Sequence, residues 1–391
     1  MSTSFLTRSL DLAPYLIECR RHLHQYPELG SVLPKTCQYV RAQLEQMGYQ
    51  VEEVASGGLL ASVGQGNGKT LLIRADMDAL PMQEESGEPF SSLHPGIAHT
   101  CGHDFHTAFL LGAAKLLKER EHEIPGTIKL FFQTAEETLE GAQSAIAAGV
   151  LQNPEVNAAM GIHVQPLLPF GHLNYPKGAF LSSVDMIQIH IRGKGCHAAM
   201  PHLGIDPINV AAHMILALQS LQVKEVPANE AVVLNICKVE SGSATNIVPN
   251  EAYLWGTLRT YNDGVCRQIK QRMQEIVACT AQAFGAEAEL DFLEHCPCTV
   301  NDPDLVDAVA SSLQTFEQPF HSNPDYRLQV SDDFGFFSQE VPTVMLMIGC
   351  KPEQGQPYTN HSPGVRYDEA VLPYGAALLA HCAWDWQMKQ K

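Results

Sequence analysis

The sequence contains no apolar run long enough to cross a bilayer, which takes roughly 18 such residues. The N-terminal stretch MSTSFLTRSLDLAPYLIECRRHLHQYPELG also lacks the uninterrupted apolar segment of a signal peptide. Basic side chains are few, since 25 Lys and Arg stand against 43 Asp and Glu, for a formal charge of −18. Because this charge repels polyanions, we expect neither nucleic acid nor an anionic membrane as a partner. The sequence therefore predicts a cytoplasmic protein.

A disulfide framework is also missing. Eleven cysteines, an odd number, are scattered from Cys19 to Cys382, so reduced thiols are expected. Tandem repeats and low-complexity linkers are absent. With 45% hydrophobic and 17% charged residues, the composition is that of a soluble globular protein. The 391 residues are enough for two or three domains of the usual ~100–200 residues.

Strand-like and helix-like patterns alternate in the first part of the chain. The segments KTLLIRADMDAL, GTIKLFFQTAEE and NAAMGIHV are typical of strands. Between them, DFHTAFLLGAAKLLKERE and TLEGAQSAIAAGVL are typical of helices, the first with Asp104 as its expected N-cap. This order predicts an α/β fold with a mostly parallel sheet that is covered on both faces.

A different pattern begins near residue 182, where Ile187, Ile189 and Ile191 alternate with polar residues. This alternation is typical of a sheet with one buried and one solvent-exposed face. The following segments have the order β-α-β-β-α-β, which is the ferredoxin-like arrangement. The first pattern returns near Thr299 with VPTVMLMIGC and LPYGAALLAHCAWDW. We therefore expect one α/β domain, residues 1–181 and 299–391, interrupted by an α+β domain, residues 182–298.

Candidate polar residues follow four of the predicted strands. They are Asp76 and Asp78, Glu136 and Glu137, His163, and, in a later loop, His361. In open α/β sheets, sites form beyond the carboxyl ends of the strands, so these residues are expected at one edge. Each has an ordinary structural alternative, such as a turn residue, a core histidine or an acidic helix start. An adjacent pair of carboxylates can also provide one metal ligand and one general base.

The stretch HTCGHDFHTAFL allows more than one interpretation. Cys101 and His103 are two residues apart, so in extended backbone their side chains point the same way, and both are good ligands for zinc-like ions. Alternatively, Cys101 is a nucleophile with His103 or His106 as its base, or simply a buried thiol in a capped loop. His99 has no assigned role.

Three residues of the predicted insert could bind substrate. His197 lies in GKGCHAAMPHLGIDPIN, Asn246 in GSATNIVPNEA and Arg259 in GTLRTYN. A neutral donor and a fixed cation can each bind a carboxylate, although structural roles are equally compatible with the sequence.

The candidate residues other than Asn246 and Arg259 fall within eight motifs, which occur in this order: HQYPELG, RADMDALPMQE, HTCGHDFHTAFLLGAA, TAEETLEGAQSAIAAGVL, GIHV, GKGCHAAMPHLGIDPI, SDDFGFF and NHSP. Essentially from end to end, the chain resembles the metallopeptidase superfamily of aminoacylases and dinuclear-zinc carboxypeptidases. Within it, the motifs are most similar to the branch of hippurate hydrolase, N-acyl-L-amino-acid amidohydrolases and auxin-conjugate hydrolases. The resemblance implies a zinc-peptidase-like catalytic domain and a ferredoxin-like lid and dimerisation domain.

The resemblance also implies roles for individual residues. It implies that two divalent ions, of zinc, manganese, nickel or cobalt, are held by Cys101, His103, Glu137, His163 and His361. Glu136 is expected to be the general base and Asp78 to orient the site. His197 resembles the lid histidine that stabilises the oxyanion in the neighbouring subunit of dimeric relatives, and Asn246 and Arg259 match positions associated with the substrate carboxylate.

Three positions depart from the pattern and bear on substrate preference. Cys196 stands where glycine commonly precedes the lid histidine, PELGSVLPKT lacks a frequent glutamate, and Asp332 replaces a glutamate.

The expected activity is metal-dependent hydrolysis of a small N-acyl-L-amino acid to a carboxylate and a free amino acid, by a homodimer through the lid or a higher homo-oligomer. The alternatives are dipeptidase-like or carboxypeptidase-like hydrolysis, a Cys101-nucleophile hydrolase, and a metal-dependent binding protein without catalysis. The sequence does not define the acyl group or the amino acid.

Overall fold

The computed structural model describes residues 4–54, 57–356 and 358–390. The chain divides into two compact units. The first comprises Met1–Phe180, Val300–Tyr326 and Asp332–Lys391, and the second comprises Leu181–Thr299 and Arg327–Ser331.

The first unit is built on a seven-stranded sheet with the order β1-β2-β4-β3-β5-β15-β6. Its strands are β1 (Val51–Val54), β2 (Gly58–Val63), β3 (Thr70–Asp76), β4 (Thr127–Gln133), β5 (Ala158–Gln165), β6 (Leu173–Asn174) and β15 (Thr343–Gly349). The central strands β4, β3, β5 and β15 are parallel, whereas β2 and β6 join them antiparallel. The predicted α/β class with a mostly parallel sheet is confirmed.

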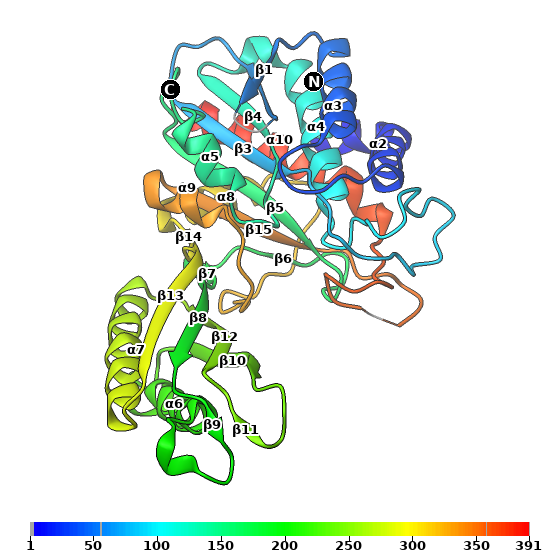
Figure 1. Ribbon diagram of the computed structural model, residues 1–391. Helices are drawn as coiled ribbons and strands as arrows, with labels where there is room; N and C mark the ends of the chain where they lie inside the picture. Colours follow the sequence, from blue (N-terminus) through cyan, green and yellow to red (C-terminus); the bar gives the residue numbers. More distant parts are fainter. Residues whose placement is uncertain (1–3, 55–56, 357, 391) are drawn as a thin grey trace. The chain divides into compact units, whose positions relative to one another are not determined.

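Helices lie on both faces of this sheet (Figure 1). They are α1 (Phe5–Asp11), α2 (Ala13–Gln25), α3 (Pro34–Gln46), α4 (His103–Lys118), α5 (Gly141–Ala147), α8 (Pro303–Leu313), α9 (Gly335–Glu340) and α10 (Leu372–Lys389). Alternate residues of β3, Leu71, Ile73 and Ala75, enter the main hydrophobic core with α4 and α10. The other residues of β3 point to the opposite face of the sheet, and two of them, Arg74 and Asp76, are charged and buried.

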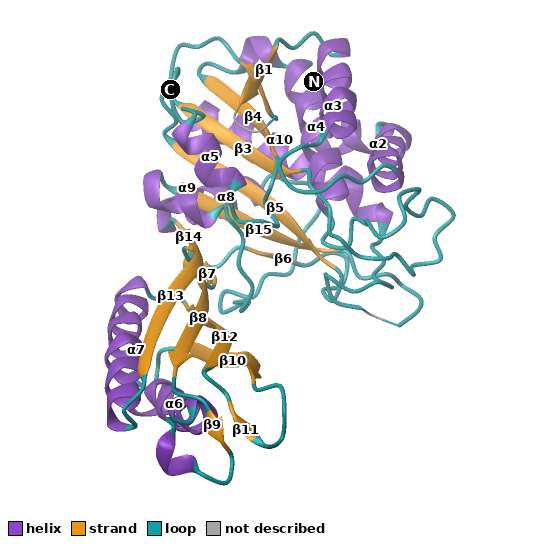
Figure 2. Ribbon diagram, viewed as in Figure 1, coloured by secondary structure: helices purple, strands orange, loops and turns teal. Residues whose placement is uncertain are grey.

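Loops rather than helices occupy the carboxyl edge of the parallel strands (Figure 2). Residues 77–102, between β3 and α4, contain neither a helix nor an extended strand. The chain also contains two short strands, β7 (Gly178–Leu181) and β14 (Thr299–Asn301), which pair with each other. It has three 3-10 turns, at Glu121–Glu123, Pro201–Leu203 and Glu369–Val371.

Helix α4 begins differently from the prediction. Its N-cap is Gly102, with a φ of +100° that favours glycine, and an added Cβ there would lie 2.3 Å from Val164. Asp104 is not the N-cap, so that prediction is wrong. Its carboxylate is fully buried and instead accepts hydrogen bonds from Arg20 and His24, both at 2.8 Å.

The second unit contains a four-stranded antiparallel sheet with the order β10-β12-β8-β13. Its elements are β8 (Val184–Arg192), β9 (Cys196–His197), α6 (Pro207–Lys224), β10 (Val232–Ser241), β11 (Ile247–Val248), β12 (Glu251–Thr260), α7 (Asp263–Ala283) and β13 (Glu287–Cys296). Ile187, Ile189 and Ile191 are buried with α6 and α7 in one core, as their alternation predicts, while Met186 on the other face is 39% exposed. The chain order of the four main strands and two helices is β-α-β-β-α-β.

Among the helices that the structure describes, none combines the length and the apolar character that a bilayer span requires.

Candidate metal centre

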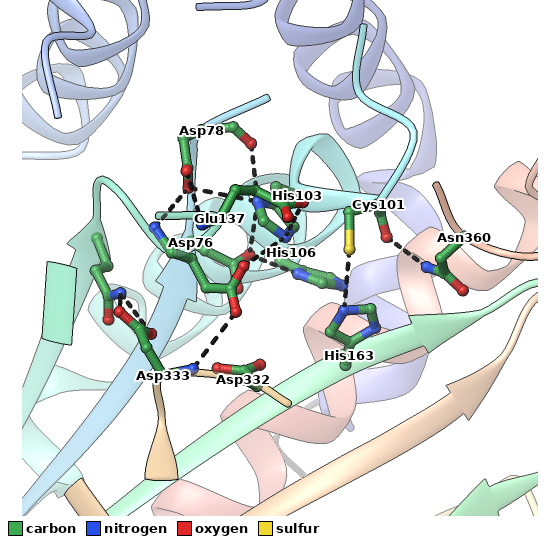
Figure 3. A network of polar contacts seen from close by, with 12 residues as sticks. Asp76, Asp78, Cys101, His103, His106, Glu137, His163, Asp332, Asp333 and Asn360 are labelled. Carbon is green, nitrogen blue, oxygen red and sulfur yellow. Dashed lines mark hydrogen bonds and ion pairs between the residues drawn. The ribbon is translucent and has the colours of Figure 1, made fainter. Parts of the chain in front are cut away.

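Side chains that follow β3, β4, β5 and β15 meet at the carboxyl edge of the parallel sheet (Figure 3). Glu137, after β4, has its Oε1 3.7 Å from Nε2 of His103 and 3.5 Å from Nε2 of His361. Sγ of Cys101 lies 3.5 Å from Nε2 of His163 on β5. The five residues that the sequence singled out as ligands are thus neighbours.

Cys101 is common to two groups of potential ligands. Its Sγ lies within 4.8 Å of ligand atoms of His103 and His163, and likewise of Glu137 and His361. The geometry therefore offers two adjacent sites, a His103/His163 site and a Glu137/His361 site, with one shared thiol.

The two sites differ in depth. His103 is fully buried, whereas the His361 side chain is 51% exposed and its backbone has a φ of +60°. The exposed loop is nevertheless fixed, because the His361 N–H donates to the Thr100 carbonyl at 2.8 Å and the Asn360 amide donates to the Cys101 carbonyl at 2.7 Å.

Backbone carbonyls orient two of the imidazoles. Nδ1 of His103 donates to the Asp78 carbonyl at 2.8 Å, and Nδ1 of His163 donates to the Val164 carbonyl at 2.7 Å. A carbonyl can only accept, so Nδ1 carries the proton and Nε2 has a free lone pair in each neutral ring.

Two buried atoms of the site are left unsatisfied. Among the described residues, neither Nε2 of His103 nor Oε1 of Glu137 has a hydrogen-bond partner. Buried polar atoms are normally paired, and a divalent cation would satisfy both of these. The residues present therefore fit a metal ion.

Asp78 shapes the glutamate pair through the backbone. Its Oδ1 accepts from the N–H of Glu136 at 3.1 Å and its Oδ2 from the N–H of Glu137 at 3.0 Å. The preceding Ala135 has a φ of +60°, a conformation that non-glycine residues rarely adopt. Asp78 thus holds a strained turn from which both glutamates project.

The two adjacent glutamates have different surroundings. Oε1 of Glu136 accepts from the Asp333 N–H at 3.4 Å, and its Oε2 lies 3.8 Å from Nε2 of His103. Burial and the charge of Asp332 raise the pKa of Glu136 well above its usual value. Burial acts in the same direction on Glu137, but the imidazole of His361, 3.5 Å from its Oε1, and the charge of His103 lower its pKa. The environments thus separate the two carboxylates chemically.

The surroundings of the Cys101 thiol disfavour its ionisation. Burial, followed by the charge of Glu137, raises its pKa well above the ordinary value. Burial also lowers the pKa of His163, the imidazole next to the thiol, well below its usual range. A bound cation would favour the thiolate form of Cys101.

Two buried residues behind the site were not predicted in the positions that they hold, since Arg74 had no assigned role and His106 was considered only as a possible base for Cys101. Arg74, in the apolar strand β3, donates to Asp76 at 2.6 Å and to Asp333 at 2.7 Å. His106 contacts Asp76 and the backbone N–H of Val164. A charged residue within LLIRAD and a histidine one helical turn after His103 were the available sequence signals.

The sequence profile of peptidase family M20/M25/M40 matches residues 72–385. The chain belongs to this family. It is therefore an M20-family hydrolase, as the motifs predicted.

Relatives of this M20-family hydrolase include the IAA-amino acid hydrolase ILR1-like 4 of Arabidopsis thaliana, at 37% identity over 99% of this chain and 89% of the relative. An N-acetyl-L-cysteine deacetylase of Bacillus subtilis is 35% identical over 92% of this chain and 85% of the relative. Among solved structures, the Bacillus subtilis protein YXEP is described as a dinuclear metal binding peptidase from the M20 family. It superposes with a TM-score of 0.85 at 30% identity, covering 97% of this chain and 99% of that one.

The remaining predicted site residues of this M20-family hydrolase lie in the second unit. His197 on β9 and Asn246 before β11 are exposed and line a hollow of about 800 Å³ within that unit. Arg259 does not join them, because it lies near the far end of β12, eight residues beyond Glu251, which also lines the hollow.

Arg259 is half-buried and bound through one nitrogen. Its Nη1 donates to the Ser331 hydroxyl at 3.1 Å and to the Gln329 carbonyl at 3.3 Å. Neither of these partners carries a charge. Burial lowers the pKa of Arg259.

Proposed function

We propose that this M20-family hydrolase cleaves the amide bond of N-acyl-L-amino acids and releases a carboxylic acid and a free amino acid. The observation that carries the proposal is the pair of unsatisfied buried ligand atoms, Nε2 of His103 and Oε1 of Glu137, beside the buried carboxylate of Glu136. The relatives described as an IAA-amino acid hydrolase and an N-acetyl-L-cysteine deacetylase support the substrate class.

His103, His163 and Cys101 would hold one divalent ion, and Glu137, His361 and the same Cys101 a second. When bound, the ions acidify and position the attacking water and polarise the amide carbonyl. A set of thiolate, imidazole and carboxylate ligands suits zinc and also accommodates manganese, nickel or cobalt.

Glu136 is proposed as the general base. Its Oε2 faces the ligand cluster, while Oε1 is held by the Asp333 N–H. Oε2 accepts the proton of the attacking water and then donates it to the nitrogen of the leaving amine. Asp78 keeps this carboxylate in place by binding the backbone N–H of the same residue.

Three residues of the second unit are proposed to bind substrate. Arg259 would recognise the amino acid carboxylate, because its Nη2 and Nε edge makes no hydrogen bond among the described residues and suits a bidentate contact. Asn246, which lines the hollow with His197 and lies apart from Arg259, would contribute to carboxylate binding from the neighbouring subunit. His197 would stabilise the oxyanion in the neighbouring subunit of a homodimer, a contact worth about 3–4 kcal/mol when preorganised.

A surface of the second unit supports the proposed homodimer. Helix α6 exposes Leu216 and Val223, which are 71% and 72% accessible to solvent. Strand β10 is an edge strand with one unpaired side. An exposed apolar stripe next to an open edge is suited to pairing with a second copy.

The alternative of a Cys101 nucleophile has less support. Of the two candidate bases, His106 has both nitrogens already hydrogen-bonded. Nδ1 of His103 is bonded to the Asp78 carbonyl, and its Nε2 lies 3.7 Å from Oε1 of Glu137. Chelation separates the two mechanisms, because it abolishes metal-dependent hydrolysis and spares a thiol-dependent reaction.

The proposed function is tested by a hydrolysis screen with defined metals. N-acetyl, N-benzoyl and indole-3-acetyl conjugates of several amino acids are compared with matched dipeptides, and release of the free amine is measured. We expect turnover of N-acyl-amino acids by the metal-loaded chain only. Hydrolysis of dipeptides alone would contradict the proposal.

A further inference from the structure

His106 lies at the centre of the buried contacts behind the ligand cluster (Figure 3). It is on α4, one turn after His103, and its side chain is 1% exposed. Its ring packs edge-to-face against the ring of His163, with 4.4 Å between centroids. Ligand atoms of His106, Asp76 and His103 also lie within 4.8 Å of one another, so this group could itself be taken for a metal site.

The hydrogen bonds of His106 argue against a role as ligand. The backbone N–H of Val164 donates to Nε2 at 3.0 Å, so Nε2 uses its lone pair as an acceptor. Nδ1 lies 2.6 Å from Oδ1 of Asp76 and, in the neutral ring, carries the proton and donates it. No lone pair remains for a metal ion.

Asp76 is in turn fixed from two sides. Arg74 donates to its Oδ2 at 2.6 Å, and the Thr107 hydroxyl donates to its backbone carbonyl at 2.9 Å. The position of His106 is therefore set by a buried ion pair and by its own helix.

His106 accepts its hydrogen bond from Val164, the residue that follows the proposed ligand His163. Val164 comes directly after His163, and its carbonyl accepts the Nδ1 proton of the His163 ring. Holding the Val164 N–H thus fixes the peptide bond that joins His163 to Val164, and with it the backbone from which the His163 ring projects. Residues that lock a ligand in this way typically change metal affinity by about 10–100-fold when they are replaced.

We propose that His106 is a positioning residue for the ion at the His103/His163 site and not for the ion at the Glu137/His361 site. The selectivity follows from the contacts, since His106 packs against His163 and bonds to Val164, while Glu137 is held by Asp78. This inference rests on the proposed function, because it requires two bound ions.

The test titrates metal-free full-length chain with Co²⁺ and measures stoichiometry by equilibrium dialysis and the thiolate-to-cobalt absorption. The variants are His106→Phe, which keeps a ring but neither hydrogen bond, and Asp76→Asn, which weakens the bond that orients the ring. His99→Phe is the matched control, because His99 is a buried histidine of the same stretch whose Nε2 has no partner among the described residues.

We expect two Co²⁺ ions per chain in the wild type and in His99→Phe. In His106→Phe, one ion should bind at least about tenfold more weakly, with a smaller effect in the same direction for Asp76→Asn. Adding His163→Ala to His106→Phe should abolish binding of the weakened ion and spare the other, whereas adding His361→Ala should weaken the other ion. Circular dichroism of the metal-free variants checks their folding, and Asp76→Asn carries the test if His106→Phe does not fold.

Equal weakening of both ions, or unchanged binding in a folded variant, would overturn the inference and leave the proposed function intact. A wild-type chain that binds no Co²⁺ would overturn both.

Discussion

Asp78 offers a prediction whose magnitude follows from two hydrogen bonds. Its carboxylate accepts from the N–H of Glu136 and of Glu137, and it is fully buried. In Asp78→Asn the amide oxygen can accept from only one of these groups, and the amide NH₂ faces the other. One buried N–H is then left unpaired, at a cost of about 1–3 kcal/mol.

The unpaired N–H destabilises the turn that carries Glu136 and Glu137. If this cost appears as displacement of Glu136 or Glu137 in the transition state, kcat/KM should fall by roughly 5–150-fold, since 1.36 kcal/mol corresponds to a factor of ten. The assay is steady-state hydrolysis of an N-acyl-amino acid by the metal-loaded variant, with metal content measured on the same sample.

The matched control is Asp307→Asn, an aspartate on α8 whose side chain is 64% exposed and, among the described residues, pairs with the exposed Lys177. Replacements of this kind usually change stability by less than about 0.5 kcal/mol, and kcat/KM should not change. A folded Asp78→Asn variant with wild-type kcat/KM would refute the reasoning.

Three further predictions concern the second unit. Arg259→Ala should raise KM by roughly 10–100-fold for substrates with a free carboxylate and leave their carboxamide analogues unaffected; an equal rise for both contradicts carboxylate binding. Burial acts to raise the pKa of Asp185, but hydrogen bonds from His295 and Lys270 lower it, so its ionisation stabilises the fold above the unfolded pKa of about 4. The stability is lost as pH falls through the depressed folded pKa, so the melting-temperature difference between wild type and Asp185→Asn should shrink below about pH 4, and a pH-independent difference counts against this. Leu216→Glu should convert a dimer to monomer in sedimentation experiments, and an unchanged dimer excludes that face of α6.

The fold class could be predicted because its signals are local. The alternation at Ile187, Ile189 and Ile191 and the apolar runs of β3 and β15 are set by which faces are buried, and the structure confirms the α/β class. The boundary between the predicted domains and the role of the second as a lid stay predictions, as does a cytoplasmic location.

The candidate site was predictable where it depends on strand ends and not where it depends on distant contacts. Glu137 and His163 lie near the carboxyl ends of the parallel strands β4 and β5, on either side of β3, so topology alone places them at one edge. Asp104 was misassigned because its partner Arg20 is 84 residues away, and no local pattern reveals that pairing. The proton positions of His106 likewise follow only from which atoms surround it. The roles assigned to the individual ligands remain predictions.

Glu136→Gln tests the central claim most directly, because it removes the proposed base and keeps the size of the side chain. The variant and wild type are loaded with the same metal, and metal content and N-acyl-amino acid turnover are measured on each sample. The account predicts two ions per chain in both proteins and a loss of kcat of about 10²–10⁴-fold in the variant. A Glu136→Gln variant that holds its metal and turns over at the wild-type rate would contradict it.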